Sequence, residues 1–151
     1  MTAFRRRAVI AGAGCTIGAL FLVFSCAESP VEVTDQVLYG QWSNRAGAIF
    51  RFDSDRTFTA RHLENSGVQS FGCEGIADID SGRWAFLVPS GGGAHAPDAT
   101  ADRGFSISVE GGGSCPLEFT STGDPGAPTL CLVADADQSC SSTEEFHRDD
   151  A

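Results

Sequence analysis

Short runs of alternating apolar and polar residues fill the chain from Tyr39 onward, and Gly, Pro, Asp and Ser separate them. In the run Phe105-Ser106-Ile107-Ser108-Val109-Glu110, every apolar residue falls on one face and every polar residue on the other. This pattern predicts half-buried β-strands, and no window shows the period of about 3.6 residues that marks an amphipathic helix. The alternation therefore restricts the domain to an all-β, antiparallel fold.

About eight strands are predicted, at 39–44, 48–53, 57–63, 82–88, 104–110, 115–120, 129–133 and 143–148. Tight turns are expected at Asp53-Ser54-Asp55-Arg56 and Gly123-Asp124-Pro125-Gly126, because Asp, Gly and Pro favour turn conformations. The longer breaks at 64–81 and 89–103 are predicted to be mobile loops. Strands joined in this way predict a single small antiparallel up-and-down β-barrel or a curled sandwich, in which closure removes the exposed edges.

An eight-stranded barrel can be filled by its own side chains or can hold one small ligand. Aromatic residues dominate the predicted inward positions, and rings in such numbers favour a filled interior. They are Trp42, Phe50, Phe52, Phe58, Trp84, Phe86, Phe105, Phe119 and Phe146.

The first 25 residues have the parts of a secretory signal peptide. Arg5 to Arg7 form a basic region, and an apolar run extends from Ala8 to Phe24. The run is 17 residues long, whereas a helix that crosses a bilayer needs about 20 apolar residues. It is therefore predicted to be a hydrophobic signal helix. An uncleaved membrane anchor is the alternative, and the arginines leave both the Sec and the twin-arginine export routes open.

The segment Val23-Phe24-Ser25-Cys26 resembles the lipobox of bacterial lipoprotein precursors. The resemblance implies that diacylglycerol is attached to the Cys26 thiol and that the chain is cut between Ser25 and Cys26. No other cofactor is expected. The mature protein would be anchored by lipid to the outer, extracytoplasmic face of the cell membrane, because a diacyl group gives stable attachment. Cys15 lacks an aliphatic residue at the corresponding position and would leave with the signal.

Residues 26–37 are polar and without periodicity, which predicts a flexible linker between the lipid and a β domain at 38–151. The chain after Cys26 contains no Lys and seven Arg, whereas all 20 acidic residues of the protein lie there. Phosphate backbones repel a domain this acidic, so nucleic acid is not an expected partner.

Several short motifs of the domain resemble a family of small actinobacterial lipoproteins that has no assigned activity, and the Gly-x-Trp starts are similar to those of lipocalins. In that family a Gly usually stands where this chain has Arg56, so the hairpin is expected to use a turn other than type I′. The resemblance implies a small β domain and an extracytoplasmic address. The motifs are Gly40-Gln41-Trp42, Phe50-x-Phe52-x-x-Asp55-Arg56-Thr57-Phe58-Thr59-Ala60, Gly82-Arg83-Trp84 and Phe146-His147-Arg148.

Four cysteines remain once Cys15 and Cys26 are set aside, and an even number in an oxidising compartment predicts two disulfides. The preferred pairing is Cys131 with Cys140 and Cys73 with Cys115, although three pairings are possible. A four-cysteine zinc site is the alternative, but no Cys-x-x-Cys spacing supports it.

No catalytic or metal-binding motif stands out. His62, His95 and His147 are isolated, and the pairs of Asp residues lack the further ligands of a calcium loop. The expected function is therefore a non-enzymatic module that binds an envelope protein. A lipocalin-like carrier of a small apolar ligand is the alternative, and an envelope enzyme is a remote third.

Overall fold

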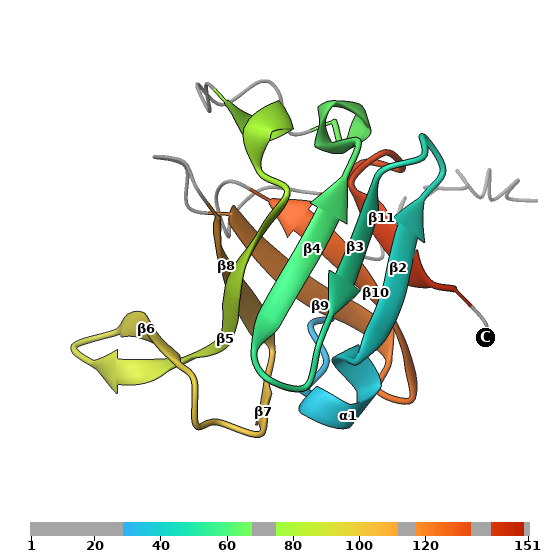
Figure 1. The fold of residues 1–151 in the computed structure, drawn as a ribbon. Coiled ribbons are helices and arrows are strands. Elements are labelled where there is room, and N and C mark those ends of the chain that lie inside the picture. Colours follow the sequence, from blue (N-terminus) through green and yellow to red (C-terminus); the bar gives the residue numbers. More distant parts are fainter. Residues whose placement is uncertain (1–28, 68–74, 112–116, 134–139, 150–151) are drawn as a thin grey trace, which may run out of the picture.

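The structure is a computed structural model that describes residues 29–67, 75–111, 117–133 and 140–149. Its main body is a closed antiparallel barrel of eight strands (Figure 1). The strands are β2 (Gly40–Asn44), β3 (Ile49–Phe52), β4 (Thr57–Arg61), β5 (Ser81–Gly91), β8 (Ser106–Gly111), β9 (Leu117–Asp124), β10 (Ala127–Val133) and β11 (Glu145–Arg148).

Each barrel strand pairs with the next barrel strand along the chain, and β11 pairs with β2 to close the ring. This order confirms the predicted up-and-down barrel, and all eight predicted strands are present within a few residues of their expected bounds. Gly82 of β5 pairs with Phe58 of β4 and with Gly111 of β8, so three strands meet closely there. A Cβ at Gly82 would lie 2.0 Å from the carbonyl oxygen of Glu110, so this crossing needs glycine.

The predicted turn at 53–56 joins β3 to β4. The amide of Asp53 donates to the carbonyl of Thr57 at 2.9 Å, and the amide of Arg56 donates to the carbonyl of Asp53 at 3.2 Å. A type I′ turn requires positive φ at both central residues, whereas in this turn Arg56 alone has positive φ, at 68°. The expectation of another turn type is confirmed, and Arg56 adopts the left-handed conformation without being glycine.

Aromatic rings fill the barrel interior. The Phe50 ring lies at its centre, with ring centroids of Phe52, Phe58, Phe119 and Phe146 at 4.8 to 5.9 Å. Eight of the nine rings predicted to point inward are buried: Trp42, Phe50, Phe52, Phe58, Trp84, Phe86, Phe119 and Phe146.

The prediction that Phe105 points inward is wrong, because its side chain is 51% exposed. The strand predicted at 104–110 is interrupted at this residue: β7 (Arg103–Gly104) ends before it and β8 begins after it. The chain bends there, so Phe105 leaves the alternation that buries Ile107 and Val109.

The prediction of a mobile loop at 89–103 is also wrong. Strand β5 continues to Gly91 and pairs with β6 (Ala94–Asp98), and the resulting hairpin projects from the barrel (Figure 1). The other long break includes the 3₁₀ helices η1 (Leu63–Asn65) and η3 (Ile76–Asp78), and Ile76 and Ile79 are buried in the core.

The segment predicted to be a flexible linker packs on the domain from Pro30 onward. Strand β1 (Val33–Thr34) pairs with β7, and helix α1 (Asp35–Leu38) lies across the lower end of the barrel in Figure 1. Val33 is buried and Val31 packs against the core, so the linker prediction for 26–37 is wrong in the part that begins at Pro30. No helix within the described ranges is long and apolar enough to span a bilayer.

Candidate functional site

The predicted lipidation and cleavage residues, Ser25 and Cys26, lie outside the described residues, but the point at which the chain joins the barrel is clear. Pro30 forms a bridge with Thr122 of β9, and the amide of Val31 donates to the carbonyl of Ser121 at 2.9 Å. The domain therefore begins four residues after Cys26.

Ser121 connects this entering segment to the bend at Phe105. Its side chain is fully buried, and its hydroxyl lies 2.6 Å from the Val31 carbonyl oxygen and 2.8 Å from the Phe105 carbonyl oxygen. The Ser121 amide also donates to the Phe105 carbonyl at 3.0 Å. The start of the domain and Phe105 are therefore held together on one side of the barrel.

A groove of about 530 Å³ lies on this same side, between the β5–β6 hairpin and the barrel. We call it the hairpin groove. Phe105 is the exposed large hydrophobic residue of the described chain, and Leu87 and Val88 beside it are partly exposed. The lining residues are Glu32, Leu87, Val88, Pro89, His95, Arg103, Gly104, Phe105, Ser106 and Glu118.

The charges at the hairpin groove are mixed. Arg103 forms an ion pair with Asp102 at 3.2 Å, and this hydrogen bond holds the pKa of the Asp102 carboxyl below its usual range. Glu32 and Glu118 add two further acidic groups to the lining. The groove thus has apolar walls and a polar rim with an acidic balance.

A second groove, of about 720 Å³, lies where β2, β3, β10 and β11 meet α1. Two of its charged groups, Asp149 and Arg51, are bonded to neighbouring side chains. The Asp149 carboxylate accepts hydrogen bonds from Gln41 at 2.7 Å and from Ser43 at 2.5 Å, and Arg51 pairs with Asp53 at 3.1 Å. These contacts stabilise the outer barrel surface. Arg148 and His147 also line the groove, and Arg148 donates to the Val37 carbonyl at 3.4 Å.

Arg56 covers Trp84 beside α1. Its guanidinium carbon lies 4.1 Å from the Trp84 ring centroid, and Nη2 donates to the carbonyl of Ala101 at 2.7 Å. Asp35 is 3.5 Å from Nη2 and accepts a hydrogen bond from the Tyr39 hydroxyl at 2.9 Å. Burial and this bond raise the Tyr39 pKa. Arg56, Trp84, Asp35 and Tyr39 together cover this end of the barrel. In the sequence, only the occurrence of Arg56 where the similar lipoproteins have Gly pointed to this cluster.

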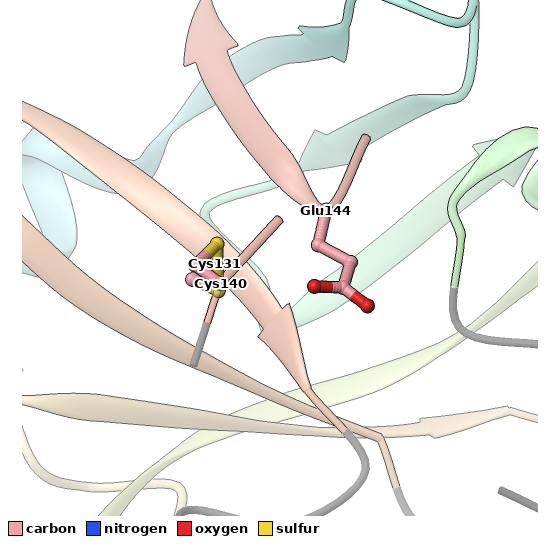
Figure 2. A group of neighbouring side chains, drawn as sticks. All are labelled: Cys131, Cys140 and Glu144. Carbon is pink, nitrogen blue, oxygen red and sulfur yellow. A yellow bond between two sulfur atoms is a disulfide. The ribbon is translucent and has the colours of Figure 1, made fainter. Parts of the chain in front are cut away.

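The predicted disulfide between Cys131 and Cys140 is confirmed, with an S–S distance of 2.02 Å and a Cα–Cα distance of 5.8 Å. It ties β10 to the segment before β11, and the buried Glu144 carboxylate lies beside it (Figure 2). The ligand atoms of these three residues lie within 4.8 Å of one another. A disulfide offers no thiolate, however, so the oxidised pair cannot act as a metal site. Cys73 and Cys115 lie outside the described residues.

The three histidines lie apart. His62 is 3.4 Å from Glu64, but both side chains are exposed and a single residue separates them along the chain. His95 lines the hairpin groove, and His147 lines the other groove. His147 shares its groove with Asp149 and pairs across the sheet with Ser43, whose hydroxyl donates to Asp149.

Comparisons of the chain with protein-family models, with curated proteins and with solved structures gave no match.

Proposed function

We propose that the protein is an extracytoplasmic lipoprotein, held at the cell membrane by diacylglycerol on Cys26, whose β-barrel is a non-enzymatic binding module. The basic residues Arg5 to Arg7, the apolar run and the Ser25-Cys26 junction support the tether. The join to the barrel at Pro30 fits this role, since a folded domain that starts so soon after Cys26 would sit close to its lipid.

The filled interior is the observation that favours a binding module over an interior carrier. A ligand held inside would need the volume that Phe50 and its neighbouring rings occupy, and those ring centroids are within 6 Å of Phe50. Core side chains are packed close to crystal density, so they do not make room for a ligand without loss of stability. Recognition would then use the outer surface, where a partner contacts side chains directly.

The tether is tested by intact-mass measurement of the exported protein. The wild-type chain should begin at Cys26 and carry the mass of a diacylglyceryl group, whereas Cys26→Ala should lose both the modification and cleavage at that site. Cys15→Ala is the matched control and should leave the mature mass unchanged, because residue 15 is removed with the signal. A wild-type N-terminus without lipid would refute the proposal.

A further inference from the structure

The hairpin groove, with Phe105 in its lining, presents apolar side chains on the surface of an acidic domain. Large exposed apolar patches with a polar rim mark interaction surfaces in soluble domains. Phe105 contributes an aromatic ring at 51% exposure, and Leu87, Val88 and Pro89 contribute the facing wall from the projecting hairpin.

The chain enters the domain at the edge of this patch. Glu32 lines the groove, and Ser121 bonds to the backbones of both Val31 and Phe105. Between Cys26 and Pro30 the chain can extend by about 14 Å at most, at about 3.6 Å per residue. A lipid on Cys26 would thus hold this side of the barrel within a short distance of the lipid headgroups.

We propose that the hairpin groove and Phe105 rest on the surface of the membrane that carries the Cys26 lipid, with the Phe105 ring placed among the headgroups. This inference depends on the proposed tether. Aromatic and aliphatic side chains are favoured in the headgroup region. Their apolar atoms are removed from water there, while neighbouring polar groups stay hydrated.

The charges of the patch indicate neutral rather than anionic lipid. Glu32 and Glu118 line the groove, and Asp102 offsets the charge of Arg103 beside it. Anionic headgroups attract clusters of Lys and Arg and repel acidic groups. A zwitterionic surface carries no such penalty, so phosphatidylcholine vesicles are the appropriate probe.

The test uses the full acylated protein in phosphatidylcholine vesicles that contain a lipid with a spin label near its headgroup. 4-Fluorophenylalanine is placed at position 105 or, as a matched control, at position 49. Ile49 is a partly exposed apolar residue of β3, and β4 and β5 separate that strand from β8. We expect the fluorine signal at 105 to broaden several-fold more than the signal at 49. Equal broadening at both positions would overturn the proposal.

A second measurement needs no fluorine label. Binding to vesicles should slow amide hydrogen exchange across residues 86–98 in the acylated wild type, and Phe105→Ser should abolish most of that slowing while exchange in the barrel stays unchanged. If Phe105→Ser loses protection throughout the barrel, the variant is unfolded. The fluorine broadening at positions 105 and 49 then decides whether the groove docks on the membrane.

The possible results distinguish a failure of the lipid tether from a failure of membrane docking by the hairpin groove. An intact mass without lipid refutes the tether, whereas a lipidated protein whose residue 105 is not broadened refutes only the docking. If acylation shifts the fluorine signal of residue 105 equally in detergent and in vesicles, without broadening, the groove holds the protein's own acyl chain and bilayer docking is wrong. Because these vesicles contain no other protein, broadening cannot come from a protein partner.

Discussion

Arg56 combines a costly backbone conformation with an extensive set of side-chain contacts. Its φ of 68° lies in the left-handed region, which costs a non-glycine residue about 1–2 kcal/mol. Its guanidinium stacks on Trp84 and bonds to Ala101, and a cation over an aromatic ring contributes about 0.5–2 kcal/mol. The contacts of the Arg56 side chain thus offset the cost of its left-handed backbone conformation, a cost that glycine would not have.

Two substitutions of Arg56 separate these effects. Arg56→Ala and Arg56→Gly both remove the contacts with Trp84 and Ala101, but only glycine relieves the left-handed backbone. We expect Arg56→Ala to lower the free energy of unfolding by about 1 kcal/mol more than Arg56→Gly does. Urea unfolding of both variants measures the difference. Equal midpoints would mean that the backbone at residue 56 is not strained.

Phe105 is a residue that the alternation of apolar and polar residues places wrongly. The period-2 pattern places Phe105 on the same face as Ile107, which is correctly predicted to be buried. The pattern cannot show the bend, which depends on the approach of Gly104 to the Phe86 ring and on the bonds from Ser121 to the Phe105 carbonyl. These contacts come from other strands, so the local sequence does not contain them.

At the scale of elements, the disulfide restrains the connection between β10 and β11. Cys131 and Cys140 are nine residues apart, and cross-linking a loop of this length stabilises the native state by about 3 kcal/mol in the chain-entropy model. The double variant Cys131→Ala with Cys140→Ala should lose about that much stability, measured by urea unfolding without reductant. A loss below about 1 kcal/mol would show that the unfolded chain is already restrained there.

The strands that the sequence predicts correctly are those that bury one face in the core. All eight barrel strands were expected, because alternation records burial on one side. Strand β6 has no buried residue, and β1 and α1 have two and four residues, so none of them gives a periodic signal. The hairpin groove is assembled from separate segments around 32, 88, 95, 104 and 118, and no local motif marks such a site.

For the molecule as a whole, the filled barrel predicts how its core responds to a cavity. Phe50 is fully buried at the centre of the ring cluster. Phe50→Ala should reduce the free energy of unfolding by about 3–5 kcal/mol. The apolar cavity should also bind a small aromatic molecule such as benzene, as engineered apolar cavities do. Denaturant unfolding with and without benzene measures both effects.

Phe105→Ala is the matched control for that experiment, because it removes the same ring from an exposed position. It should change stability by no more than about 0.5 kcal/mol, and benzene should not alter its unfolding midpoint. Similar losses for Phe50→Ala and Phe105→Ala would contradict a core centred on Phe50.

A closed barrel offers no free strand edge, but the hairpin restores one. Strand β6 has β5 as its only partner in the nine-stranded sheet, so its far side presents unpaired backbone groups. Exposed edges invite another chain to add a strand, and short length and proline both oppose this. Strand β6 is five residues long and contains Pro97, with Asp98 at its end. The short length and the proline thereby oppose edge-to-edge aggregation of the projecting hairpin, which would matter if the proposed lipid tether concentrates the protein in the plane of a membrane.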